Sequence, residues 1–178
     1  PENDTRYALI KELVVKFEEA TTFGSLISMD NQEQDFVDLQ NTIENLVAEG
    51  DTLQKAAAKK LLPLVIQAKI LAKKYDAAIA NPPYMGQGYF NASLKYFAST
   101  VFKEWSGDLF TCFIKRMINF LKKNGNLSLI TIGTWTFLPT YENMRASFLK
   151  EVNFSSIIDN GRGVWGSDHG SIMFSAAK

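Results

Sequence analysis

The sequence predicts an α/β fold in which a helical region, residues 1–74, precedes a sheet region, residues 75–178. Two observations support this division. Before residue 75, apolar residues recur at helical spacing and no phosphate loop or metal-ligand spacing occurs, so we interpret this region as a scaffold or a helical insertion. From residue 75 onward, short apolar runs alternate with amphipathic stretches, which is typical of a parallel sheet with helical connections.

A first helix is predicted near the N-terminus. Asp4 or Thr5 can cap it, because short polar side chains accept hydrogen bonds from the first helical N–H groups. Its apolar residues recur at helical spacing, at Leu9, Leu13, Val14 and Phe17. Gly24 lies beyond its end, and we expect residues 23–29 to form a short extended or buried connector.

Two capping-box patterns are expected to open the next helices. The Asp-x-x-Glu pattern at 30–33 begins a helix that Gly50 ends. The Asp-x-x-Gln pattern at 51–54 begins another helix, which runs toward Pro63. Because proline lacks an N–H and clashes with the preceding turn, Pro63 should break or kink this helix, or begin a fourth helix that reaches Leu71.

The sheet region is predicted to alternate strands and helices. Strands are expected at 76–80, 127–132, 155–158 and 171–175, with helices at about 93–105, after Asp108, and at 141–150. The helix that Asp108 caps is strongly amphipathic. Lys122 and Lys123 suit the dipole at its C-terminus, and Gly125 is expected to end it. A short Gly-rich link without a helix joins the last two strands, so we expect them to be antiparallel.

Length and composition indicate one ordinary globular domain with a core. The chain has 178 residues, of which 46% are hydrophobic and 21% are charged. The formal net charge is zero, which is not typical of a free-standing DNA-binding protein, so any positive surface is local or lies elsewhere. The single cysteine, Cys112, excludes an internal disulfide, fits a buried core thiol and suits the cytoplasm. No apolar run is long enough to span a membrane.

The most informative stretch is the tetrad Asn81-Pro82-Pro83-Tyr84, which follows strand 76–80. A residue before proline is held in an extended conformation, so Asn81 should point outward. Because proline has no N–H and a fixed φ, the carbonyls here are left free to accept from a ligand. The Asn81 side-chain oxygen and the Pro82 carbonyl are two acceptors beside the flat Tyr84 ring. This set fits a planar amine; the alternative is a plain turn or a polyproline ligand.

The run from Tyr75 to Tyr84 resembles the signature of S-adenosylmethionine-dependent amino-group methyltransferases, chiefly the adenine-N6 DNA enzymes. The tetrad alone also occurs in enzymes that methylate a glutamine side chain. Three further segments are most similar to the phage-defence (BREX-type) PglX methyltransferases, with type IIG restriction–modification enzymes a near second: 84–86, 134–138 and 157–161. The resemblance covers residues 75–178.

The resemblance implies the distal half of a Rossmann-like methyltransferase sheet. Strand 76–80 should lie beside 127–132, strand 171–175 should come next and run antiparallel, and strand 155–158 should lie at the edge. In this class the donor binds a Gly-rich turn and an acidic residue, and neither occurs before residue 75. We therefore interpret the chain, which starts at Pro1 without a methionine, as a piece of a longer protein that carries most of the donor site.

The resemblance also implies roles for particular residues. Asn81 and Pro82 would be catalytic and would hold the N6 amine of a flipped adenine, with Asn81 near the methyl group of S-adenosyl-L-methionine. Tyr84 would stack on the base. Further candidates to bind the substrate are Pro83, Tyr89, Phe90, Trp135 and Trp165. The expected partner is DNA, through the longer protein; other defence-system proteins and self-association through strand 76–80 are further candidates, and no membrane partner is expected.

Two other functions stay open: protein-glutamine methylation, and a non-catalytic interaction module of a defence complex.

Two other sequence features give weaker evidence of function. The run 161–166 fits a dinucleotide fingerprint, but a strand and not a helix is expected after it, so we interpret it as a hairpin link. His169 is the only histidine and cannot build a zinc site, so no metal is expected.

Overall fold

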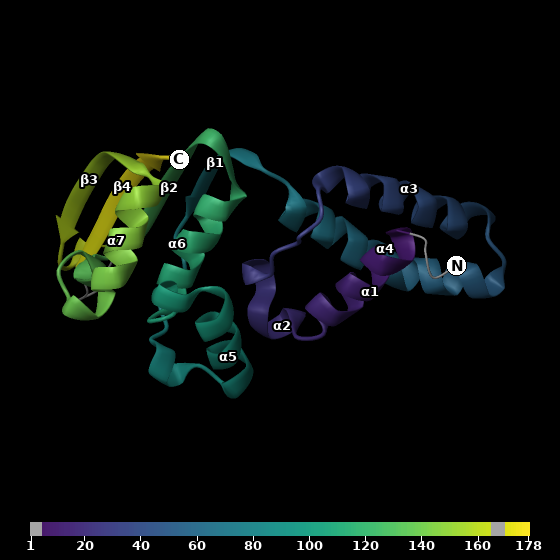
Figure 1. Cartoon of the computed structure of the whole chain (residues 1–178), viewed down its shortest axis with the longest axis horizontal. Helices are drawn as coiled ribbons and strands as arrows, with labels where there is room; N and C mark the ends of the chain where they lie inside the picture. The colour runs from purple at the N-terminus through teal and green to yellow at the C-terminus, as the bar shows by residue number, and fades with distance from the viewer. Residues whose placement is uncertain (1–4, 165–169) are drawn as a thin grey trace. The chain divides into compact units, whose positions relative to one another are not determined.

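In the computed structural model, which describes residues 5–164 and 170–178, the chain divides into two units, Pro1–Lys73 and Lys74–Lys178 (Figure 1). The first unit is helical, and the second contains the whole sheet. The α/β class expected from the sequence is therefore confirmed. Asp4, Trp165, Gly166 and His169, which the sequence analysis singled out, lie outside the described residues.

The helical unit is built on two long helices, α3 and α4, which lie side by side with α1 against them (Figure 1). Its elements are α1 (Thr5–Phe17), α2 (Ala20–Phe23), η1 (Gly24–Leu26), α3 (Glu33–Glu49) and α4 (Thr52–Ala72). The core consists of aliphatic residues and one phenylalanine: Leu9, Leu13, Phe36, Leu39, Ile43, Ala58, Val65 and Ala68. Val14, which we expected on the apolar face of α1, is exposed. The expected connector at 23–29 contains the turn η1, and its buried residues are Leu26 and Ile27.

Helix α3 begins differently from the sequence prediction. Its N-cap is Gln32, whose backbone N–H donates to the Asp35 carboxylate at 3.0 Å. Asp30, the predicted cap, instead forms an ion pair with Lys16 of α1 at 2.7 Å. The predicted capping box at 30–33 was therefore wrong. Asp35 lies three residues after Gln32, so the box forms between these two residues. The box at 51–54 is confirmed, with the Gln54 N–H donating to Asp51 at 2.8 Å.

Pro63 neither ends α4 nor begins a new helix. The helix continues from Thr52 to Ala72 with the proline inside it, so the predicted break and the predicted fourth helix were wrong, and the predicted kink stays a prediction. A proline in a helix interior costs about 3 kcal/mol or more. Ala58 on one side of the proline and Val65 and Ala68 on the other are all buried in the same core, and this packing offsets the lost hydrogen bond.

The sheet unit has strand order β1-β2-β4-β3, as predicted (Figure 1). The strands are β1 (Tyr75–Ala80), β2 (Leu121–Ile132), β3 (Asn153–Gly161) and β4 (Ser171–Ala177). β1 is parallel to β2, and β4 is antiparallel to both of its neighbours. The expected antiparallel insertion of the last strand is thus confirmed, and with it the interpretation of the 161–166 run as a link between strands.

Helices α6 (Leu109–Phe120) and α7 (Glu142–Glu151) lie against one face of this sheet. The unit also contains α5 (Ala92–Val101) and the short turns η2 (Gln87–Tyr89), η3 (Lys103–Trp105), η4 (Gly133–Thr136) and η5 (Pro139–Tyr141). Phe148 of α7 packs on Phe154 of β3 and Phe174 of β4, with ring centroids 4.9 and 5.6 Å apart. The opposite face is more open: Ile79 is 81% exposed and Ile158 is 54% exposed.

Helix α6 ends at Phe120, earlier than predicted. Gly125 lies inside β2 and does not stop the helix, and Lys122 pairs with Asp76 of β1 at 2.9 Å and not with a helix end. A Cβ at Gly125 would come within 3.1 Å of the Lys122 carbonyl oxygen and 3.2 Å of the Asp76 carbonyl oxygen. Glycine therefore suits the close approach of β1 and β2 here, because a Cβ would make these contacts tight.

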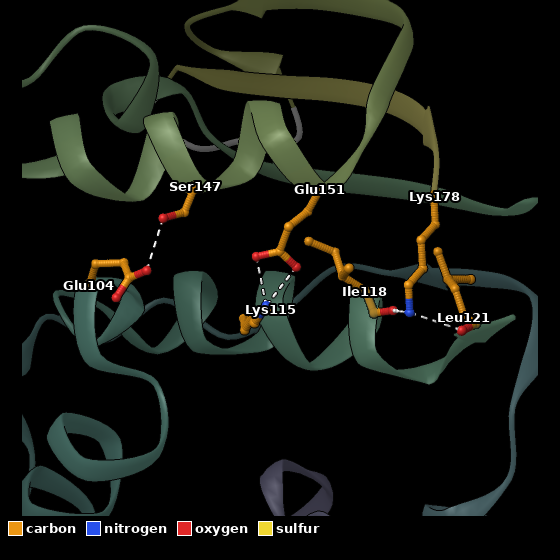
Figure 2. A network of polar contacts seen from close by, with 7 residues as sticks. All are labelled: Glu104, Lys115, Ile118, Leu121, Ser147, Glu151 and Lys178. Carbon is orange, nitrogen blue, oxygen red and sulfur yellow. Dashed lines mark hydrogen bonds and ion pairs between the residues drawn. The ribbon is translucent and has the colours of Figure 1, made fainter. Parts of the chain in front are cut away.

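Polar contacts hold α6 firmly between its neighbours (Figure 2). Lys115 of α6 pairs with Glu151 of α7 at 2.6 Å. Glu104 of η3 accepts from Ser147 of α7 at 2.9 Å. At the other end of α6, the Lys178 ammonium donates to the carbonyls of Ile118, at 3.0 Å, and Leu121, at 3.2 Å. α6 is thus fixed along its length.

Among the described helices, none is both long and apolar enough to cross a bilayer.

Candidate active site

The tetrad leaves the sheet at the carboxyl end of β1. Ala80 is the last residue of β1 to pair with β2, opposite Leu129, and Asn81 follows directly. Asn81 and Pro83 are exposed, whereas Pro82 is buried and anchors the turn. The described chain contains no cis peptide bond, so both prolines are trans. Asn81 therefore lies where parallel strands of an α/β sheet open toward ligands.

Tyr84 folds back over Asn81. Its hydroxyl lies 3.1 Å from the Asn81 Oδ1 and 3.4 Å from the Ile130 carbonyl oxygen, and it can donate its single proton to either. The ring contacts Phe110 edge-on, with centroids 6.0 Å apart. Partial burial raises the pKa of the Tyr84 hydroxyl, so it remains a neutral donor at physiological pH. In this structure the Tyr84 hydroxyl thus occupies the acceptor predicted to bind a substrate amine.

Backbone hydrogen bonds attach the loop after Tyr84 to the start of α6. The Leu109 N–H donates to the Met85 carbonyl at 2.9 Å, and the Gln87 N–H donates to the Gly107 carbonyl at 3.1 Å. Between these bonds, Gly86 forms an isolated antiparallel bridge with residue 108. The tetrad is therefore held on both sides, by β1 before it and by the first turn of α6 after it.

The structure separates the remaining predicted substrate-binding residues. Tyr89 is 85% exposed in η2, close in sequence to the tetrad. Phe90 is buried, and Trp135 is only 4% exposed. The Trp135 indole donates to the Thr131 hydroxyl at 3.0 Å, and its ring packs against Phe148. Phe90 and Trp135 are thus both buried in this structure. Their role in substrate binding stays a prediction.

Two residues that the sequence analysis did not single out are exposed near this edge of the sheet. Phe137 and Leu138 follow η4, and Phe137 is 68% exposed. The Arg145 guanidinium holds their turn by donating to the carbonyls of Trp135 and Leu138, both at 2.7 Å. Trp135 is buried and Phe137 is exposed, and no sequence pattern predicts this difference, because the turn is irregular.

A cavity of about 450 Å³ lies beside Asn81 on the open face of the sheet. Its lining includes Ile79, Asn81, Ser128, Ile130 and Met173, and none of its described lining residues is charged. Ser128 and Ser175 share a hydrogen bond of 2.8 Å within this lining. The cavity can accept apolar groups and offers nothing to pair with a charged ligand.

Cys112 has the structural role expected from the sequence. It is fully buried in α6, and burial raises the pKa of its thiol to about 12, so the thiolate does not form at physiological pH. Among the described residues, no three or more His, Cys, Asp or Glu side chains are grouped so that they could hold a metal ion.

The sequence of the chain matches known methyltransferases. The family model of the Eco57I restriction-modification methylase matches residues 7–165. The chain is 34% identical over 176 residues to the adenine-specific methyltransferase BrxX of Escherichia coli O9:H4 (strain HS), covering 98% of this chain and 15% of that protein. It is 26% identical over 144 residues to the adenine-specific methyltransferase PglX of Lacticaseibacillus casei (strain Zhang), covering 76% of this chain and 12% of that protein.

One solved structure shows a weaker likeness. It is named as a class I S-adenosylmethionine-dependent methyltransferase from Listeria monocytogenes, and it matches with a TM-score of 0.49 at 11% sequence identity. The match covers 99% of this chain and 69% of that one. The chain spans less than a fifth of the length of either methyltransferase relative described above.

Proposed function

This chain belongs to the Eco57I restriction-modification methylase family, and on that premise we propose that it forms the target-base site of a DNA adenine-N6 methyltransferase of a phage-defence system. The longer protein would transfer the methyl group of S-adenosyl-L-methionine to an adenine flipped out of the duplex. Both relatives are named as adenine-specific methyltransferases, which favours DNA over a protein glutamine as the substrate. A DNA substrate also favours the cytoplasm as the location.

The observation that carries this proposal is the position of Asn81. An exposed amide oxygen stands at the carboxyl end of β1, one residue before a buried proline whose carbonyl precedes Pro83, a residue with no N–H. We expect the two oxygens to act as a pair of acceptors. An adenine N6 amine has two N–H bonds to donate, so its hydrogen-bonding capacity matches this pair.

The acceptors would act mainly in the transition state. The N6 lone pair is delocalised into the ring and is therefore a weak nucleophile. Accepting both N–H bonds at Asn81 and Pro82 favours a pyramidal nitrogen and stabilises the positive charge that develops on it. Holding the nitrogen in line with the incoming methyl group supplies much of the remaining rate enhancement. No conventional general base is required.

Tyr84 would change partners when the base enters. Its hydroxyl and the substrate amine compete for the same Asn81 oxygen. Once the amine takes that oxygen, the ring can turn to stack on the base, a contact worth about 1–3 kcal/mol. Tyr89, which is largely exposed after the tetrad, is a second candidate for base contact, and the exposed Pro83 is a third.

We expect that the described residues of this chain do not make a complete donor site. S-adenosyl-L-methionine carries an amino group and a carboxylate, and the cavity beside Asn81 has no charged lining residue among those described. We therefore assign the donor mainly to other parts of the longer protein, with Asn81 near the methyl group. Calorimetric titration of this chain alone with the donor should show no binding. A dissociation constant in the low micromolar range would contradict this assignment.

Two partner assignments belong to the same proposal. β1 is an end strand of the described sheet, and an unpaired strand edge invites pairing with a second chain, so we expect this chain alone to self-associate. In the longer protein, other defence-system proteins are candidate partners. Light scattering of this chain measures the first assignment, and a monomer at high concentration would contradict it.

Substitution of Asn81 tests the proposal. In the full-length protein, Asn81→Ala should abolish DNA methylation and leave the fold intact, because the side chain is exposed at a strand end. Asn126→Ala, which removes another exposed amide from β2, is the matched control and should methylate normally. Methylation is measured as transfer of a labelled methyl group to DNA. Normal transfer by the Asn81 variant would refute the mechanism, and transfer to protein and not to DNA would favour glutamine methylation.

A further inference from the structure

The carboxylate of Asp108 joins two parts of the sheet unit that are distant in sequence. Asp108 is the N-cap of α6 and is only 7% exposed. Its Oδ1 accepts from the Phe110 N–H at 3.2 Å, which is the capping bond. The same oxygen accepts from the Met85 N–H at 3.0 Å, and Met85 directly follows the tetrad. One oxygen thus fixes both the start of the helix and the end of the tetrad.

We propose that Asp108 is a positioning residue for the tetrad, acting on methyl transfer through Met85 and Tyr84. This inference rests on the proposed function. Asp108 does not contact Asn81 or Tyr84 by any described bond. It sets the backbone position of Met85, and so the direction in which the chain leaves the two acceptors. Any shift of that backbone moves Tyr84 against Asn81.

Capping alone does not account for this arrangement. Asp51, the N-cap of α4, has the same reciprocal box, but its side chain accepts from Gln54, within its own helix. Asn91, the N-cap of α5, likewise accepts from Leu94 in its own first turn. Asp108 has the same local role and, in addition, a bond to a residue 23 positions earlier. The extra bond marks a function beyond beginning a helix.

The first turn of α6 holds Tyr84 in two ways. Asp108 holds the backbone after Tyr84, and Phe110 in the same turn holds its ring by the edge contact. The helix itself is fixed by Lys115, which pairs with Glu151 of α7 (Figure 2). The support of the tetrad is therefore rigid along a continuous path from α7 through α6 to Met85.

The chemistry of the side chain predicts how substitutions differ. A carboxylate gives stronger hydrogen bonds than a neutral acceptor, and its charge suits a helix N-terminus. Asparagine keeps the oxygen at the same distance from the backbone and loses only the charge. Serine also caps helices well, but its oxygen is one bond closer to the backbone and cannot reach Met85 while capping. Asp108→Ser therefore removes the hydrogen bond with Met85 and keeps the capping of α6.

The test uses the full-length protein and compares Asp108→Ser with Asp51→Ser. Asp51→Ser is the same change at an N-cap that forms no described hydrogen bond outside its own helix. The kcat of Asp108→Ser should fall about 10- to 100-fold, since a misplacement on the order of 1 Å can cost about a hundredfold. Asp108→Asn should recover only part of the lost kcat, because its neutral amide oxygen accepts a weaker hydrogen bond than the carboxylate. Asp51→Ser should leave kcat unchanged. Fluorescence of aminopurine at the target position should show weaker or slower stacking of the flipped base only in Asp108→Ser.

Each outcome decides the proposal. A kcat of Asp108→Ser equal to that of Asp51→Ser would overturn it, whatever the loss of thermal stability. If Asp108→Ser does not fold, Asp108→Asn decides: a lower kcat at unchanged melting temperature supports positioning, and an unchanged kcat overturns it. Asn81→Ala keeps the two proposals apart. If that variant is fully active, the proposed function fails. If it is inactive while Asp108→Ser is fully active, only the positioning role fails.

Discussion

The helical unit and the sheet unit differ in how their sequences encode structure. The core of the helical unit is mostly aliphatic, and its two long helices, α3 and α4, begin at caps that bond within their own first turn. The sheet unit instead gathers aromatic rings from distant segments, among them Trp105, Trp135, Phe148 and Phe174. The lesson is that local signals define the scaffold, whereas the candidate site depends on contacts between segments far apart in the sequence.

The largest expected effect comes from removing the centre of the aromatic cluster. Phe148 is fully buried and contacts the rings of Trp105, Trp135, Phe154 and Phe174. Phe148→Ala should destabilise the sheet unit by about 3–5 kcal/mol through the lost burial and the cavity left behind. Hydrogen exchange should then rise in β3, β4 and α7 and stay unchanged in α3 and α4. Equal loss of protection in both units would show that they unfold together.

A change of the opposite sign is expected at Pro63. The residue is exposed inside α4, and an alanine would restore a backbone donor to the helix. Pro63→Ala should stabilise the helical unit by about 1–3 kcal/mol. Slower hydrogen exchange in α4, without a change in β1 or β2, would confirm that the gain is local. No gain in α4 would mean that the helix has already adapted to the proline.

Cys112 gives an effect that is confined to the sheet unit and to alkaline pH. The folded state keeps its thiol neutral, with a pKa of about 12 against an ordinary value near 9.0. Because the folded pKa is the higher one, its contribution to stability is complete below the ordinary pKa and is lost as the pH rises from the ordinary to the folded pKa. The slope should be about 1.4 kcal/mol per pH unit between these two values.

Thiol alkylation measures this directly, since Cys112 is the single cysteine of the chain. In this chain, labelling near neutral pH should require unfolding of the sheet unit, so Phe148→Ala should accelerate it and Pro63→Ala should not. Fast labelling of the unsubstituted chain would show that α6 opens without global unfolding. A Cys112→Ala variant should lose the extra pH dependence of stability.

The smallest effect is expected for Tyr84→Phe. The substitution removes the hydroxyl that lies 3.1 Å from the Asn81 oxygen and keeps the ring. In the full-length protein, methylation should be nearly unchanged and binding of target DNA equal or slightly tighter, because the amine no longer competes with the hydroxyl. Tyr84→Ala, the control, should lose about 1–3 kcal/mol of stacking. A large loss of activity in Tyr84→Phe would show that the hydroxyl takes part in the reaction.

Patterns in the sequence were sufficient wherever one segment determined its own structure. The Asp51 box, the four strands and their order were predicted correctly, and so was the buried Cys112. Errors arose where two local signals competed or tertiary packing prevailed. Asp30 found a partner in Lys16, and Gly125 served close strand approach and not helix termination.

The candidate site was predictable only in part. Asn81 and its prolines are a local motif, so the exposure of Asn81 at a strand end could be anticipated. The burial of Trp135 could not, because irregular turns have no period from which a direction can be inferred. The hydrogen bond between Asp108 and Met85 could not be predicted either. The sequence indicates a helix cap at Asp108 and a loop after Tyr84, but it does not show that the two lie next to each other.

The position of β4 between β2 and β3 has a consequence for synthesis on the ribosome. β3 pairs with β4 in the described sheet, and β4 is made after it. While the chain is emerging, β3 therefore has no neighbour to pair with, and it presents Ile157 and Ile158 beside an open edge. Translation adds roughly 5–20 residues per second, so this interval lasts long enough for wrong partners to bind. We expect nascent chains that stall before residue 171 to depend on chaperones.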